Sequence, residues 1–151
     1  MVTASEQLDR RFADLKPFAS AAVRPSRGWI RAIRDGLGMT TAQLARRMGV
    51  TQPRITELEN GEASGKITLH SLERAAEAMN CRLVYAFVPM QPLTETIHER
   101  ATSLASRQLA SIEQTMRLEN QSVTDKARHD EALQRLVSEL ERKPARLWDD
   151  L

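Results

Sequence analysis

The chain has 151 residues, which is enough for one domain or for one small domain with a sizeable extension. Apolar residues make up 41% of it but aromatic residues only 4%, a composition that favours helices over a β-sandwich. Residues 1–56 hold ten basic and four acidic side chains, whereas residues 91–151 hold nine basic and eleven acidic ones. This asymmetry predicts a protein that meets a polyanion with its amino-terminal part.

The remaining composition argues against several classes of protein. The single cysteine, Cys81, excludes an internal disulfide and fits a reducing compartment. No stretch is apolar enough to cross a membrane, and the first residues lack the apolar centre of a signal peptide, so we expect a cytoplasmic protein without a membrane partner. The three histidines stand far apart, as expected for surface residues or caps, and no phosphate loop or nucleophile motif is present. The sequence therefore predicts no metal, no cofactor and no enzymatic activity.

The chain begins with a short predicted helix at residues 5–15, where Leu8, Phe12 and Leu15 share one face. A connection bracketed by prolines follows it. We assign residues 1–27 to this helix and its linker.

Four further helices are predicted within residues 28–80. The first covers residues 29–37, and Thr41 can cap the second, AQLARRM, which Gly49 closes. Thr51 caps the third, a loop NGEASGKI follows it, and the fourth covers residues 68–79. Helical spacing assigns these side chains to one core: Trp29, Ile30, Ile33, Leu37, Leu44, Ala45, Met48, Ile55, Leu58, Leu69, Leu72, Ala75, Ala76 and Met79.

The second and third of these helices fit a helix-turn-helix. Ala45 is small enough for a close contact between helices, Gly49 gives the turn its permissive backbone, and Val50 fills the angle. Pro53 is tolerated because first-turn amides have no partner within the helix.

Burial of the apolar face of the third helix leaves a polar face exposed. That face carries Gln52, Arg54, Thr56 and Glu57. A glutamine can hold an adenine edge with two hydrogen bonds, an arginine can reach guanine or phosphate, and a glutamate can accept from cytosine. The amino end of the helix, at Thr51, also offers backbone N–H groups to a phosphate. The pattern predicts a recognition helix for double-stranded operator DNA; Arg46 and Arg47 fit solvated charges as well as phosphate contacts.

Residues 81–88, CRLVYAFV, change the period and read as a β-strand that Pro89 ends. The sequence offers this strand no second strand, so the same segment of another copy is the simplest partner. We expect residues 81–90 to form a two-stranded sheet between the subunits of a homodimer.

Residues 91–151 are predicted to be a helical extension. One long helix covers about residues 93–120, with a stripe that includes Leu93, Ile97, Ala101, Leu104, Ile112 and Met116. Another starts at Ser122 or Thr124 and ends before Pro144.

Residues 30–80 resemble the lambda-repressor/Cro-like helix-turn-helix domains, through L-G-M-T-x-x-x-L-A-x-x-M-G-V-T-Q and I-x-x-L-E-N-G. The fold class is then mainly α, with that domain, one intersubunit strand and a carboxyl-terminal helical extension. The resemblance implies a structural ion pair between Arg34 and Glu59. It also implies phosphate contacts from Thr41, Asn60 and Lys66. Pro53 departs from the family, which often places a base-reading side chain there, and this shifts the readout to Gln52, Arg54 and Glu57.

Three longer blocks, RPSRGWIRAIRDGLGMT, EASGKITLHSLERAAEAMNCRLVYAFVP and RLWDD, resemble the mobile mystery protein A family. This resemblance implies an antitoxin that represses its own promoter and inhibits a Fic-domain partner, a toxin that transfers AMP onto protein hydroxyls. Fic inhibitors carry Ser or Thr, three residues, then Glu and Gly or Asn. The segment TMRLEN fits, with Thr115, Glu119 and Asn120. A glutamate on a rigid helix can pair with the arginine that binds the ATP phosphate and so prevent productive ATP binding.

Two alternatives stay open. The protein is a DNA-binding repressor only, with carboxyl-terminal helices that serve dimerisation, or it is an inhibitor whose helix-turn-helix no longer binds DNA. Glu119 on a solvated surface helix fits the first alternative.

Overall fold

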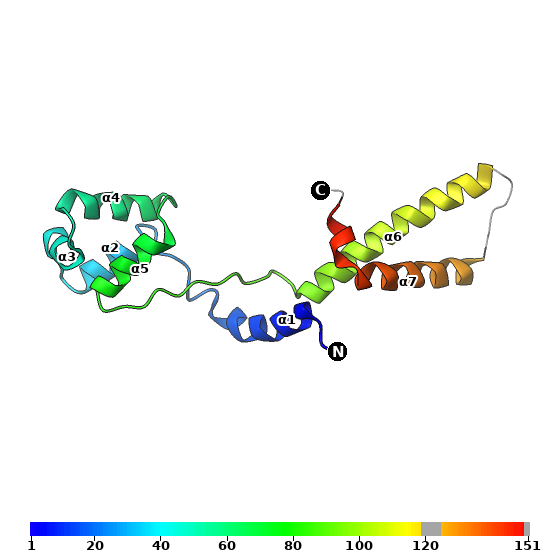
Figure 1. The fold of residues 1–151 in the computed structure, drawn as a ribbon, viewed down its shortest axis with the longest axis horizontal. Helices are drawn as coiled ribbons and strands as arrows, with labels where there is room; N and C mark the ends of the chain where they lie inside the picture. Colours follow the sequence, from blue (N-terminus) through cyan, green and yellow to red (C-terminus); the bar gives the residue numbers. More distant parts are fainter. Residues whose placement is uncertain (119–124, 150–151) are drawn as a thin grey trace. The chain divides into compact units, whose positions relative to one another are not determined.

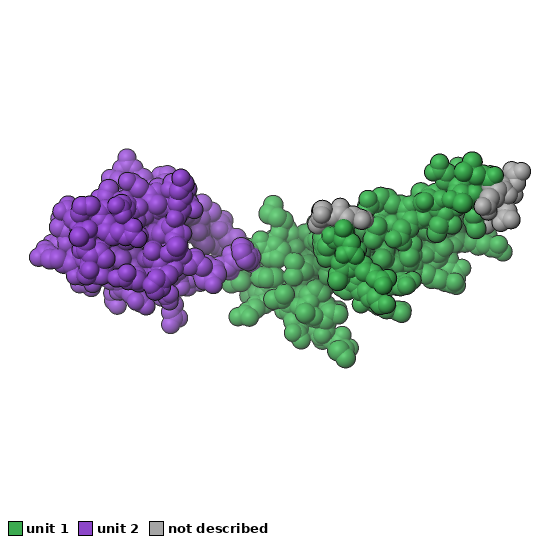
Figure 2. Space-filling model, turned by 45° about the horizontal axis from the view of Figure 1, so that its top comes forward, with its two compact units in different colours: residues 1–17, 88–151 green, residues 18–87 purple. Residues whose placement is uncertain are grey.

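The computed structural model describes residues 1–118 and 125–149, and the chain divides into two compact units (Figure 2). Residues 18–87 form one, the central unit. Residues 1–17 and 88–151 form the other, the terminal unit, so the amino-terminal helix packs with the carboxyl-terminal part of the chain. The sequence grouped that helix with the linker, in residues 1–27, because local patterns give no sign of a partner so distant in the chain.

The central unit contains four helices around one apolar core (Figure 1): α2 (Trp29–Gly36), α3 (Thr41–Met48), α4 (Gln52–Ala63) and α5 (Leu69–Ala78). The buried core residues are Ile30, Leu44, Ala45, Ile55, Leu58, Ala75 and Met79. All seven stand at positions that the helical period predicted, which confirms the helical part of the fold. Trp29, Leu37 and Leu69 were also assigned to the core, but they are 41%, 57% and 49% exposed because they lie at helix ends, where the apolar face is incomplete.

The start of α3 corrects the sequence prediction by one residue. Thr40, not Thr41, is the cap: its hydroxyl oxygen accepts from Gln43 N at 3.2 Å, and Gln43 Oε1 accepts from Thr40 N at 2.8 Å. This reciprocal pair is a capping box, which a threonine three residues before a glutamine favours. Thr41 thus becomes the first residue of the helix, and its side chain is free for another contact.

The end of α4 corrects a second boundary. The sequence predicted a loop from residue 60, but the helix continues through Gly61 to Ala63. Glu62 is 2% exposed, and its carboxylate accepts from the backbone N–H groups of Trp29 at 2.6 Å and Ile30 at 2.9 Å. These contacts hold the last turn of α4 in place, so a tertiary interaction overrides the weak helix propensity of Asn-Gly.

The strand predicted at residues 81–88 is not formed in the single chain, where these residues belong to no helix and no strand. Asn80 ends the helical region with a φ of 57°, a left-handed conformation that asparagine tolerates. No described segment lies beside residues 82–88 with backbone hydrogen bonds. A strand needs a partner for its ladder, and one copy of the described chain supplies none.

The terminal unit consists of α1 (Ala4–Leu15), α6 (Leu93–Leu118), α7 (Lys126–Arg142) and a 3₁₀ turn, η2 (Pro144–Trp148). Its core contains Ala101, Ala105, Val137, Leu140 and Leu147. The two fully buried alanines let α7 and η2 approach α6 closely. α7 begins after Asp125, whose carboxylate accepts from Ala127 N; the predicted starts, Ser122 and Thr124, lie outside the described residues.

The distal part of α6 differs from the predicted apolar stripe. Ile112, a member of that stripe, is 50% exposed because the core of the hairpin lies near η2; Leu118, which was not assigned to the stripe, is 83% exposed. Figure 1 shows α6 and α7 close together beside η2 and farther apart toward their connection.

The amino end of α6 is capped by a residue far away in the sequence. Asp9 of α1 accepts from Leu93 N at 2.6 Å, from Thr94 N at 3.0 Å and from Thr94 Oγ1 at 2.9 Å. Burial alone would raise the pKa of Asp9, but these hydrogen bonds hold the pKa below its usual value. Asp9 therefore ties α1 to the start of α6 as a carboxylate.

Candidate nucleic-acid interface

Helices α3 and α4 are joined by a tight turn. Gly49 adopts a left-handed conformation with a φ of 68°, and Val50 N donates to Ala45 O at 3.0 Å. Ala45 is 3% exposed, which allows the close helix contact that the sequence predicted. Pro53 lies in the first turn of α4, where no hydrogen bond is lost. The geometry is that of a helix-turn-helix.

One face of α4 is open to solvent. Ile55, Leu58 and Glu59 are buried, whereas Gln52, Arg54, Thr56, Glu57 and Asn60 are exposed. Thr51 precedes the helix with extended backbone and makes no capping hydrogen bond with its side chain. The first-turn N–H groups of α4 therefore lie next to exposed polar side chains, and together they form a surface that can face a nucleic acid.

Gln52 is positioned by the residue that the capping box of α3 sets free. Its Nε2 donates to Thr41 Oγ1 at 2.9 Å. The second Nε2 hydrogen and Oε1 of Gln52 stay available, which is the donor and acceptor pair that an adenine edge requires. The hydroxyl hydrogen of Thr41 stays available as well. The structure thus brings together two residues that the sequence treated as separate contacts.

Arg54 and Glu57 form a pair on the same face. Arg54 Nη1 lies 2.9 Å from Glu57 Oε2, and the two side chains are 51% and 64% exposed. Pairs at this spacing on an exposed helix stabilise it by only about 0.3–0.5 kcal/mol. Glu57 therefore orients the guanidinium without removing it from solvent.

Glu59 is turned away from this surface. Its Oε1 accepts from Arg34 Nε at 2.6 Å and its Oε2 from Arg34 Nη2 at 3.3 Å, and both residues are buried. Arg34 Nη1 also donates to Met39 O at 2.9 Å. The hydrogen bonds that Arg34 donates to Glu59 raise the pKa of Arg34 above its usual value, against the effect of burial. The carboxylate of Glu59 is thus neutralised inside the unit and does not repel a phosphate backbone.

Glu62 stabilises the start of α2, a role that the sequence analysis did not identify. It acts as the missing cap of α2, because the residue before that helix is Gly28, which has no side chain to cap with. Gly28 has a φ of 88°, and a Cβ built there would lie 2.7 Å from Glu62 Cδ. The sequence did hold one sign of this role: α2 begins after a glycine, which cannot cap it, so its first N–H groups need an acceptor from elsewhere in the fold.

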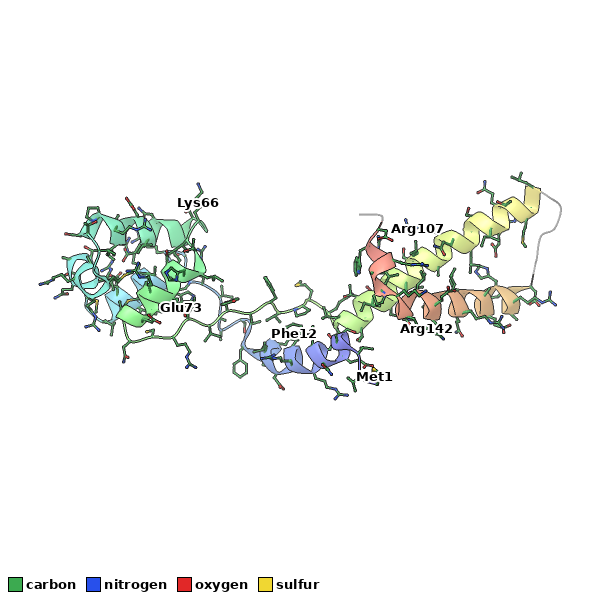
Figure 3. The ribbon with its side chains drawn as sticks, in the orientation of Figure 1. Met1, Phe12, Lys66, Glu73, Arg107 and Arg142 are labelled. Carbon is green, nitrogen blue, oxygen red and sulfur yellow. The ribbon has the colours of Figure 1, made fainter. Side chains whose placement is uncertain are left out.

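The basic residues around the helix-turn-helix divide into two groups. Arg47 Nε donates to Ala78 O at 2.6 Å, and Arg74 Nη2 donates to Met48 O at 3.1 Å. These two cations thus stabilise helix carboxyl ends. Arg46 and Lys66 are exposed, and Figure 3 shows Lys66 pointing outward from the loop after α4. Arg46 and Lys66 can therefore reach a phosphate, whereas Arg47 is held against α5.

The second predicted site, in the terminal unit, is described only in part. Thr115 is exposed, and its hydroxyl donates to Ser111 O at 3.1 Å, one turn earlier in α6. Glu119 and Asn120 lie outside the described residues.

The two histidines of the terminal unit lie at the surface, as expected, and each faces a carboxylate. His98 Nδ1 lies 2.6 Å from Glu141 Oε1, and His129 Nδ1 lies 2.5 Å from Glu113 Oε1. Each pair joins α6 to α7. No cluster of three or more potential metal ligands occurs within residues 1–118 and 125–149.

The turn and the open face of α4 are those of the helix-turn-helix class of DNA-binding transcription regulators. Residues 30–85 match the family model described as Helix-turn-helix and form a domain of its lambda-repressor/Cro-like type. Comparison with curated proteins and with solved structures gives no match. None of the helices in the described ranges is both long enough and apolar enough to span a bilayer.

Proposed function

We propose that the protein is a dimeric repressor that inserts α4 into the major groove of operator DNA and reads bases with Gln52 and Arg54. The observation that carries this proposal is the open face of α4. Gln52 is held by Thr41 and Arg54 is oriented by Glu57, so the two base-reading side chains are arranged before DNA arrives. Because less side-chain freedom is lost on binding, such arrangement favours affinity.

The phosphate contacts surround this face. The hydroxyl groups of Thr41 and Thr51 lie at the amino ends of α3 and α4, where the helix dipoles favour an anion. Thr56 and Asn60 are exposed along α4, and Lys66 extends beyond its end. These contacts fix the position of the helix on the duplex and carry no sequence information.

The dimer rests on residues 81–88. Val84, Tyr85 and Phe87 are 79%, 70% and 90% exposed, and neighbouring exposed apolar side chains of this size mark interaction sites. Strand pairing between two copies brings apolar side chains of this segment together and supplies backbone hydrogen bonds that it lacks in one copy. Two recognition helices on one two-fold axis then fit a palindromic site.

The test is binding to DNA from the promoter region of the protein's own operon. Gln52→Ala and Arg54→Ala should each weaken specific binding by about 1–3 kcal/mol and relax the preference at one or two base pairs. Lys66→Ala should weaken all sequences equally and reduce the dependence on salt. Arg107→Ala, an exposed arginine of α6, is the matched control and should change nothing. Unchanged binding in all three variants would mean that this helix-turn-helix does not bind DNA.

The terminal unit supports a second function, inhibition of a Fic enzyme by an antitoxin. Its support is the TMRLEN segment at the end of α6, together with the exposure of Ile112 and Leu118 in the same part of the helix. An exposed apolar stretch beside the motif fits a protein partner. Wild-type protein should suppress AMP transfer by the Fic enzyme encoded in the adjacent gene, and Glu119→Ala should restore it. If Glu119→Ala inhibits the enzyme as well as wild type does, the TMRLEN segment is not the inhibitor, and only the repressor function remains supported.

A further inference from the structure

Residues 82–88 have unpaired backbone, whereas Cys81 N donates to Ala76 O at 2.8 Å, and residues 81–84 show a side-chain alternation of period two. Cys81 and Leu83 are half-buried, whereas Arg82 and Val84 are exposed. The odd-numbered positions therefore face the body of the central unit, and this face continues into the exposed Tyr85 and Phe87. The single chain contains nothing, within its described residues, that covers those two aromatic rings.

An apolar groove lies where the odd-numbered face meets the helices of the same unit. It has a volume of about 230 Å³ and is lined by Trp29, Ile33, Leu72, Met79, Cys81 and Leu83, together with Ile30, Ala76, Arg82 and Val84. Trp29 lines this groove and is 41% exposed, although its backbone N–H group donates to Glu62 Oε1 at 2.6 Å. Sites for small ligands usually measure roughly 300–1,000 Å³, so this groove is better suited to a protein side chain.

We propose that residues 81–87 of two copies pair in antiparallel register about a two-fold axis through Val84, and that the partner's aromatic side chains close the Trp29 groove. This inference rests on the dimer of the proposed function and names its register and its contacts. The occupant is a second copy of this chain, because the segment is complementary to itself in both backbone and side chains.

Symmetry limits the register. A two-fold axis that exchanges antiparallel strands is perpendicular to the sheet, so it maps each face of the sheet onto the same face. Residues directly opposite each other also share a face. Opposed residues must therefore both be odd or both be even, and the axis must pass through a residue, not between two residues.

The groove favours an axis through Val84 over the other central choice, an axis through Tyr85. An axis through Tyr85 would place Cys81 opposite the partner's Pro89, which has no N–H group for the ladder. An axis through Val84 pairs Cys81 with the partner's Phe87 and Leu83 with the partner's Tyr85. The partner's Phe87 and Tyr85 then lie opposite Cys81 and Leu83, which both line the groove.

The same register explains the open groove. Both aromatic rings of one copy lie on the face of the sheet that carries Cys81 and Leu83 of the other. The partner's Phe87 therefore lies beside Cys81, at the edge of the Trp29 groove. One contact thus covers Tyr85 and Phe87, which are 70% and 90% exposed in the single chain, and closes the groove.

The register can be tested by cysteine cross-linking of the full-length protein in a Cys81→Ser background, which removes the natural thiol. Val84→Cys places two thiols directly opposite, with Cα atoms about 4.5–5.5 Å apart, which is within the range of a disulfide. Tyr85→Cys is the matched control, because its two copies are diagonal neighbours about 7–8 Å apart. Under mild oxidation Val84→Cys should form a covalent dimer at least about tenfold faster than Tyr85→Cys. Faster linkage of Tyr85→Cys, or equal rates, would overturn the register.

The groove contact has an independent readout, because Trp29 and Trp148 are the only tryptophans. In a Trp148→Phe variant, Trp29 fluorescence should shift to the red as the protein is diluted to monomers. A Tyr85→Ala/Phe87→Ala double variant should show the red-shifted emission at every concentration, with unchanged helix content by circular dichroism. A dimer by light scattering with concentration-independent Trp29 emission would place the interface elsewhere. DNA binding should be measured on the same samples. A protein that binds DNA but shows no change in Trp29 emission would contradict this interface and leave the DNA-binding function intact.

Discussion

The two units are stabilised by different means. The central unit buries charge: Arg34, Glu59 and Glu62 are all at most 9% exposed, and each has hydrogen-bond partners. The terminal unit uses an apolar hairpin built on Ala101 and Ala105, with its charged contacts at the surface. A buried charge is costly if its partner is lost, whereas a surface pair contributes little. The unit that carries the DNA-binding face is therefore the one whose geometry depends most on single polar contacts.

The largest expected effect comes from breaking the buried pair. Glu59→Ala leaves the Arg34 guanidinium buried without its carboxylate, which should destabilise the central unit by about 3–5 kcal/mol. Denaturation followed by Trp29 fluorescence in a Trp148→Phe background reports on this unit alone. Glu57→Ala, which removes an exposed carboxylate from the same helix, is the control and should cost less than about 1 kcal/mol. Equal costs for the two variants would show that burial of the pair is unimportant.

A core truncation tests the terminal unit in the same way. Leu147 is fully buried against α6, so Leu147→Ala should cost about 2–5 kcal/mol. Trp148 fluorescence in a Trp29→Phe background follows the transition. Leu118→Ala, at a site that is 83% exposed, should be nearly neutral. If Leu147→Ala lowered the stability reported by Trp29 as much as that reported by Trp148, the two units would not be stabilised separately.

The smallest expected effect is the pH dependence that Asp9 gives the terminal unit. Because the pKa of Asp9 is lower in the folded chain, its stabilisation is present above the unfolded value of about 4 and is lost as the pH falls through the folded pKa. Asp9→Asn should therefore destabilise the unit at pH 7 and should flatten the decline in stability toward pH 2. Asp14→Asn, an exposed position of the same helix, should retain the decline. Thermal unfolding reported by Trp148 across this range measures the difference.

Local patterns explain which features of the fold could be predicted. The seven core residues of the central unit repeat at helical spacing, and Gly49 marks the turn, so the position of the helix-turn-helix follows from neighbours in sequence. The exposed face of α4, with Gln52 and Arg54, follows from the same period. The boundary at Thr40 was missed by one residue because two adjacent threonines can both cap, and only the Gln43 contact separates them.

The strand was predicted from composition, yet a strand exists only when its backbone has a partner, and a single chain does not provide one here. For the same reason, the sequence could indicate the segment at residues 81–88 but could not assign its pairing. The exposure of Tyr85 and Phe87 and the groove at Trp29 became visible only with the tertiary structure.

The sequence by itself determined the helices, the turn and the polar face of α4, because these depend on residues within one or two turns of each other. The tertiary structure alone decided which carboxylates support the fold: Asp9 caps a helix that begins 84 residues later, and Glu62 caps one that begins 33 residues earlier. A carboxylate gives no periodic signal of its partner. Its role is fixed by which unpaired N–H groups the folded backbone brings within hydrogen-bond distance.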